Sequence, residues 1–271
     1  MIKKIFAVLT VCLIFSAFAV PVFAVEETPV SDFEYSVQDG GISINKYTGS
    51  NTEVVIPSKI EGKPVKEIAW AAFENCTAVV SIEIPDGVTH ISSFAFRHCE
   101  SLKSLKIPDS VDFIGDLAFA DCTSLVSLTL PNGLNSIPEL TFNKCTSLAL
   151  IEIPESVKSI GDYAFLECSS LTELIIPPNV KSVGMCALAE CNSLKTIIVP
   201  DGLDISKTEI PETAAQIKYR KTANGVEITE IISGTDGNNA EIPKEICGMP
   251  VVSFGEDISS RAGIYEESEE I

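Results

Sequence analysis

The sequence is poor in basic, histidine and aromatic residues. Its 271 residues include 19 Lys and Arg against 38 Asp and Glu, two histidines and one tryptophan. The net charge of −19 argues against a nucleic-acid or anionic-membrane partner, because both require clustered Lys and Arg. His90 and His98 are too few and too isolated to predict a metal site or a serine-type catalytic triad. The sequence therefore predicts no enzyme activity and no cofactor.

Long apolar runs are missing except at the N-terminus. Lys3 and Lys4 precede an apolar run from Ile5 to Val20, and Val22-Phe23-Ala24 fits the small-residue rule for signal-peptide cleavage. We predict a signal peptide over residues 1–24, and with it a secreted, extracellular or cell-surface protein with no membrane span after cleavage. A retained membrane anchor is the alternative, which is disfavoured because the run is short for a bilayer.

The rest of the chain is dominated by residues that recur every 23 positions. A self-similarity of about 20–29 residues is typical of leucine-rich solenoids, in which each turn of the chain buries its apolar side against the next turn. We call one such turn a coil. The positions that keep this register are the prolines Pro85, Pro108, Pro131, Pro154, Pro177 and Pro200, the cysteines Cys76, Cys99, Cys122, Cys145, Cys168 and Cys191, and the phenylalanines Phe73, Phe96, Phe119, Phe142 and Phe165.

Each coil contains one segment with the alternation of a strand. From Ser104 to Ile107 polar and apolar residues alternate, so Leu105 and Ile107 are expected to face inward. Pro108 then ends the strand, because proline has no N–H to donate. The predicted fold is a leucine-rich repeat solenoid that is mostly β, with short helical or 3-10 turns, a parallel sheet on one face, and columns of like side chains inside. Gly115, Gly161 and Gly184 recur at one corner, where we expect a positive φ.

The cysteine column allows three interpretations. Cysteine is small and among the most buried residue types, so a ladder of free, buried thiols is favoured. Disulfides between adjacent coils form the second interpretation, since stacked Cα atoms about 5 Å apart are within bonding range. A metal site is the third, and it is disfavoured because the sequence has no CxxC pair.

A partner would contact the outward side chains of the strands, which stand two and four residues before each proline. Leu150, Ile175 and Ile198 are apolar members of this set, and two interpretations of them stay open: an exposed interface, or a surface covered by the C-terminal segment. The candidate face comprises Ser81, Glu83, Ser104, Lys106, Ser127, Thr129, Leu150, Glu152, Glu173, Ile175, Thr196 and Ile198.

The array is flanked by two similar segments. Asp39-Gly40-Gly41 predicts a hairpin turn, and the six-residue spacing from Tyr35 to Gly41 returns from Tyr219 to Gly225. We therefore predict an N-terminal β-hairpin module over residues 25–65, the array over 66–212, and a second, partial module with an acidic tail over 213–271. The loop Gly234–Asn239 is expected to form a hairpin turn, since it lacks the full acidic pattern of a calcium loop.

The phrase IPxxVxxIGxxAFxxCxSLxxLxIP, as in Ile107–Pro131 and Ile153–Pro177, resembles the BspA-like leucine-rich repeat family of bacterial surface proteins. The resemblance covers about residues 53–203. It implies a right-handed solenoid, a secreted or surface location, and non-catalytic binding to host or neighbouring-cell components. The predicted function is therefore adhesion to a protein or glycoprotein partner by a monomer, with a structural spacer or self-associating surface-layer unit as the alternative.

Overall fold

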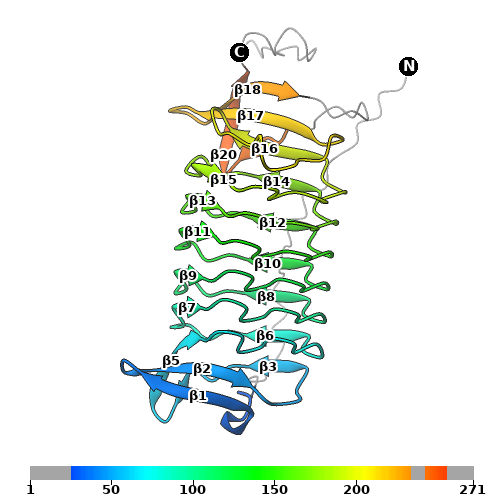
Figure 1. Ribbon diagram of the computed structural model, residues 1–271. Coiled ribbons are helices and arrows are strands. Elements are labelled where there is room, and N and C mark those ends of the chain that lie inside the picture. The colour runs from blue at the N-terminus through cyan, green and yellow to red at the C-terminus, as the bar shows by residue number, and fades with distance from the viewer. Residues whose placement is uncertain (1–25, 233–241, 255–271) are drawn as a thin grey trace, which may run out of the picture.

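The computed structural model describes residues 26–232 and 242–254. The predicted signal peptide, the loop Gly234–Asn239 and the acidic tail lie outside the described residues. The described chain forms a rod of stacked coils with a strand-rich module at each end (Figure 1). This is the predicted leucine-rich repeat solenoid, built almost entirely from strands. The one helix in the described ranges is the 3-10 turn η1 (Val30–Asp32), and the bends of the array are hydrogen-bonded turns.

The predicted parallel sheet is a column of short strands, one from each coil. Their centres, such as Leu105 and Leu128, point into the rod and are buried, because the strand alternates apolar and polar residues. Neighbouring strands pair without a register shift, Leu105 with Leu128 and Leu128 with Ile151. The column consists of β3 (Glu53–Val55), β6 (Ser81–Glu83), β8 (Ser104–Lys106), β10 (Ser127–Thr129), β12 (Leu150–Glu152), β14 (Glu173–Ile175) and β16 (Thr196–Pro200).

A second column of parallel strands lines another side of the rod. Each of these strands has two residues. The second of them is a buried isoleucine in all but the last coil, where Val183 is half-buried. These strands are harder to predict from the sequence, because two residues are too few to show an alternation of polar and apolar side chains. The column consists of β7 (His90–Ile91), β9 (Phe113–Ile114), β11 (Ser136–Ile137), β13 (Ser159–Ile160) and β15 (Ser182–Val183).

The bends between the two-residue strands and the cysteines form a third ladder. In one coil the N–H groups of Leu117, Phe119 and Asp121 donate to the carbonyls of the next coil, at 3.1, 3.0 and 2.7 Å. Leu117 and Asp121 have positive φ angles of 56° and 61°, and the equivalent residues of the other coils do as well. These angles direct successive N–H groups to the same side, which lets irregular backbone pair across coils.

The prediction of a positive φ angle at the corner glycines is wrong. Neither Gly115, Gly161 nor Gly184 has one, and the left-handed position lies two residues later, at Leu117 in the first of these coils. The glycines are present for a different reason, which is the close approach of the neighbouring coil. A Cβ on Gly161 would lie 2.6 Å from the backbone nitrogen of Glu139.

Substituting Gly161 with alanine is therefore expected to lower the free energy of unfolding by about 1–3 kcal/mol, because two backbones must separate. The matched control is Gly133→Ala, where the nearest atoms to a Cβ are 3.9 Å away and the substitution should be nearly neutral. Urea unfolding followed by circular dichroism measures both. Equal effects of the two substitutions would contradict the close approach.

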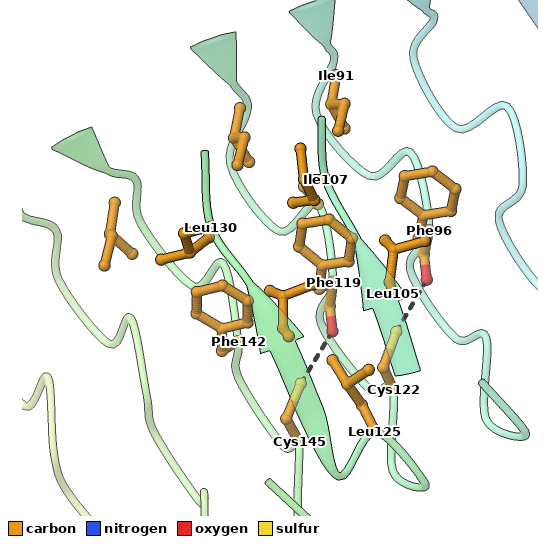
Figure 2. Close-up of a cluster of buried hydrophobic side chains, with 14 of the residues drawn as sticks. Ile91, Phe96, Leu105, Ile107, Phe119, Cys122, Leu125, Leu130, Phe142 and Cys145 are labelled. Atoms are coloured by element: carbon orange, nitrogen blue, oxygen red, sulfur yellow. Dashed lines mark hydrogen bonds between the residues drawn. The ribbon is translucent and has the colours of Figure 1, made fainter. Parts of the chain in front are cut away.

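The interior is a set of stacked side-chain columns. The rings of Phe96 and Phe119 stack with centroids 5.3 Å apart and planes 7° from parallel, and Phe119 and Phe142 follow at 5.7 Å. All five phenylalanines of the register are fully buried. Figure 2 shows the rings of Phe96, Phe119 and Phe142 in a row, with leucine and isoleucine side chains around them. One continuous apolar core thus runs through the array.

The cysteines of the register form a second column beside the rings. The described cysteines are free thiols, so the disulfide interpretation does not apply to them. The thiol of Cys122 donates to the carbonyl of Phe96, and that of Cys145 to Phe119, each with 3.2 Å between Sγ and oxygen (Figure 2). The thiol thus satisfies a buried carbonyl of the preceding coil, which alanine or valine would leave without this partner.

Two modules of strands close the ends of the described rod. The N-terminal module contains η1, β1 (Phe33–Gln38), β2 (Gly41–Tyr47), β4 (Lys59–Ile60) and β5 (Lys63–Ile68). Its hairpin turn is at Asp39 and Gly40, both with positive φ. The C-terminal module contains β17 (Ala215–Lys221), β18 (Val226–Ile232), β19 (Glu245–Ile246) and β20 (Met249–Phe254). It joins the array through β16, which pairs with β17 in parallel.

Candidate partner-binding face

The outward side chains of the three-residue strands form one continuous face. Because the strands pair in register, Ser104 lies beside Ser127, and Lys106 beside Thr129. Successive strands are about 4.8 Å apart, so the face repeats its side chains at that interval. The members that are exposed or half-buried are Ser81, Glu83, Ser104, Lys106, Ser127, Thr129, Leu150, Glu152, Glu173 and Ile175.

The face ends earlier than the full set of predicted residues. Thr196 is only 8 % exposed and Ile198 is fully buried, so their inclusion in an accessible face is wrong. The C-terminal module covers them, which is the second of the two interpretations of the apolar residues. Ile198 packs in a small separate core with Ile217 and Tyr219, and half-buried Ile175 lies against the same core. The Tyr219 hydroxyl also donates to the carbonyl of Ile176 at 2.8 Å, which fixes the module on the array.

The apolar part of the remaining face lies in its middle. Leu150 is 63 % exposed, and Val126, which immediately precedes β10, is 52 % exposed. Val126 is not among the predicted residues of the face, and no sequence signal marks it, since the equivalent positions of other coils include apolar Val80 and Ala149 as well as charged Lys103 and Lys195. Val126 directly precedes Ser127, the register partner of Leu150, so the two exposed apolar residues come from adjacent positions of neighbouring coils. Serine, threonine, lysine and glutamate residues surround them.

A second group of exposed side chains lies on the opposite part of the coil. Trp70 is 65 % exposed and its ring lies 5.8 Å from that of Phe94, over which the guanidinium of Arg97 lies at 5.5 Å. Phe113 is 48 % exposed beside His90. The two ring pairs, Trp70 with Phe94 and His90 with Phe113, each join neighbouring coils but do not extend into a column, since Ser136 follows Phe113 in the register. They belong to the bends and the two-residue strands, separate from the candidate face.

The repeat geometry agrees with known proteins. The family model described as the BspA type leucine rich repeat region matches residues 42–149 and 89–219, with 6 copies. The chain belongs to the BspA-type leucine-rich repeat family. The comparison with curated proteins gives no match.

Two solved structures are similar to this BspA-type chain. A leucine rich cell surface protein of Faecalibacterium prausnitzii is 26 % identical, over 85 % of this chain and 72 % of its own, with a TM-score of 0.54. A leucine-rich repeat protein of T. pallidum is 34 % identical, over 69 % of this chain and 80 % of its own, with a TM-score of 0.46.

The thiols of the BspA-type repeats are held in their protonated form. Burial raises the pKa of the Cys76 thiol to about 11 and that of Cys191 to about 12. Burial raises the pKa of Cys122, Cys145 and Cys168 well above the usual range. A nucleophile or metal ligand has to be a thiolate, so these residues are suited to packing and not to chemistry.

We expect the free energy of unfolding to decrease between about pH 9 and pH 12. In the unfolded chain the thiols ionise near their ordinary pKa of 9.0, whereas Cys76 and Cys191 stay protonated in the fold up to about 11 and 12. The folded state then binds more protons than the unfolded state, so stability is full below pH 9 and is lost as the pH rises toward the folded pKa values.

Urea unfolding from pH 7 to pH 11.5 measures this loss, and the double variant Cys76→Ala/Cys191→Ala serves as the control. The variant should show a shallower decrease, because two of the thiols whose pKa is raised in the fold are absent. A decrease of the same slope in both proteins would assign the effect to other groups.

The two histidines occupy surface positions of the BspA-type coils. His90 contacts the Thr89 hydroxyl at 2.9 Å, and His98 lies 3.6 Å from the Asp121 carboxylate. In the described residues no three His, Cys, Asp or Glu side chains gather in a way that could hold a metal ion. A search of residues 26–232 and 242–254 likewise finds no helix with the length and apolar character needed to span a bilayer.

Proposed function

We propose that this BspA-type chain is a secreted or cell-surface protein that binds a protein or glycoprotein partner without catalysis. The binding surface is the outward face from Ser81 to Glu152. The observation that carries the proposal is an exposed apolar centre, Val126 and Leu150, within a strip of polar strand residues. Protein interfaces have the same distribution of residues, with an apolar centre and a polar rim.

The rigidity of the face supports this function. Its side chains stand on strands that are paired on both edges from β6 to β10, so little backbone order has to be gained on binding. The predicted signal peptide supports an extracellular location. The similar protein of Faecalibacterium prausnitzii is described as a cell surface protein, which fits the same location.

The alternative function, a self-associating spacer, needs an open edge at the end of the rod. The N-terminal edge is partly closed, because the N–H of Phe33 donates to Val30 within η1 and is not available for strand pairing. Head-to-tail association would need this edge as well as an edge at the C-terminal end, so its partial closure favours the binding function and a monomer. Size-exclusion chromatography with light scattering distinguishes the two, since a spacer that self-associates would elute as a concentration-dependent oligomer.

The test of the proposal uses the mature chain, residues 25–271, and the double variant Val126→Glu/Leu150→Glu. A partner captured from mucosal or bacterial extracts is purified, and its affinity is measured by biolayer interferometry. Charges in the apolar centre should weaken binding at least about tenfold, as expected for interface hot spots. The matched control is Phe113→Glu, which places a charge at a similarly exposed apolar position off the face. Equal affinity of the double variant and the native chain would contradict the proposal.

A further inference from the structure

The C-terminal module repeats the strand pairing of the N-terminal module. In each, an antiparallel hairpin (β1–β2, β17–β18) is followed by a strand that pairs with it in parallel (β5, β20). A two-residue strand (β4, β19) then pairs antiparallel with the start of that third strand. Register shifts also recur at the same places: before Tyr35 and Tyr219 in the hairpins, and after Ile42 and Val226 in the parallel pairs.

The turns of the two modules match as well. The turn between β4 and β5 has positive φ at Glu61 and Gly62, and that between β19 and β20 has positive φ at Cys247 and Gly248. These pairings and turns align residues 33–47 with 217–231 and residues 60–68 with 246–254. The C-terminal module is therefore a second copy of the same structure.

The burial of the two copies differs where an array lies against one copy and not against the other. On the side of the preceding array, Tyr219 is 1 % exposed whereas its counterpart Tyr35 is half-buried. Four inner positions are buried in both modules, namely the pairs Phe33 and Ile217, Ile42 and Val226, Ile44 and Ile228, and Ile60 and Ile246. Three other positions are buried in the N-terminal module, where Tyr47 is 6 %, Val65 1 % and Ile68 0 % exposed. Their counterparts Ile231, Val251 and Phe254 are only half-buried. We call these three residues the open end of the C-terminal module.

The N-terminal module shows what covers these positions. The first coil of the array lies on them: the Phe73 ring stacks on Tyr47 at 5.4 Å, and the N–H of Tyr47 donates to the Ala72 carbonyl. Strand β7 of the next coil extends the sheet by pairing Ile91 with Ile68 at the free edge of β5. The corresponding edge of β20, at Ser253 and Phe254, has no strand beside it in the described residues.

We propose that the open end of the C-terminal module is a docking surface for a further leucine-rich repeat coil. The occupant is a BspA-type coil placed after the module, with its chain running in the same direction as the coils of the first array. It covers Ile231, Val251 and Phe254 and pairs a two-residue strand with Ser253 and Phe254. The free edge is short, because β19 already occupies the start of β20, so it fits such a coil and not a long extended peptide. The module is thus a connector that can begin a second array while it closes the first.

The test joins a second array to the module. In the extended protein, residues 255–271 of the mature chain are replaced by a second copy of residues 69–254. Docking should slow hydrogen exchange of the β18 amides at least about tenfold relative to the mature chain, because the module then opens only together with its neighbours. The added coils should be as protected from exchange as the equivalent coils of the first array.

A substitution at the open end makes the test independent of how well the added array folds. Phe254→Asp is measured in both the mature chain and the extended protein. In the mature chain Phe254 is half-buried, and the loss of stability should be small. In the extended protein it should be larger, with at least a tenfold greater change in the unfolding equilibrium constant. Equal effects in the two proteins, unprotected added coils, or unchanged β18 exchange would each overturn the proposal.

Discussion

Replacing Phe119 with alanine is expected to lower the free energy of unfolding by about 3–5 kcal/mol, the range for a fully buried phenylalanine. Phe119 is 0 % exposed and stacks on a ring on each side, at 5.3 and 5.7 Å. The cavity would lie in the middle of the rod, where the adjacent coils are held by their own hydrogen bonds and cannot close it. Urea unfolding monitored by circular dichroism gives the value.

The control is Phe113→Ala, on the two-residue strand β9 of the same coil. Phe113 is 48 % exposed, so its removal should change the unfolding free energy by less than about 1 kcal/mol. Because each coil contacts mainly its neighbours, the Phe119 variant should also show faster exchange in the adjacent coils than at the rod ends. A loss for Phe119→Ala no larger than that for Phe113→Ala would refute the stacked core as the main source of stability.

Replacing Ile198 with aspartate is expected to detach the C-terminal module. Ile198, on β16, is fully buried in the core of the module, so a carboxylate there would lie among apolar side chains. Burying an unpaired charge costs several kcal/mol, and the module can avoid this by separating from the array. We therefore expect rapid cleavage by trypsin at Lys218, Arg220 and Lys221, while the array stays folded.

Leu150→Asp is the matched control, because it introduces the same charge on the same column of strands. Leu150 is 63 % exposed, so the carboxylate stays in water and the cleavage pattern should remain that of the native chain. Resistance of the Ile198 variant to trypsin would show that the module is held by contacts other than this core.

Most of the fold can be predicted from the sequence, because the stacking repeats one environment at a fixed interval. Phe119 and Cys122 recur in five or six coils, so their inward direction can be inferred without knowledge of the neighbouring coil. Ile198 shows the limit of this reasoning. It follows the same alternation as exposed Leu150, and only the tertiary contact of a distant module buries it.

The bends could not be predicted for a different reason. Left-handed backbone is disfavoured for large side chains, so the sequence directs attention to Gly115 and away from Leu117. In the structure Leu117 has the positive φ, and its hydrogen bond to the next coil compensates for the unfavourable angle. The end of the candidate face was likewise set by three-dimensional contacts, since no local pattern marks Thr196 as buried.

The ladder of bends aligns peptide dipoles along one side of the rod. Along this side the N–H groups of Leu117, Phe119 and Asp121, and of their counterparts, all point to the following coil. The peptide dipoles are therefore aligned, with their positive ends toward the C-terminal end of the array. The last members of the two left-handed columns, Glu209 and Glu190, are exposed carboxylates, and both place negative charge at this positive end.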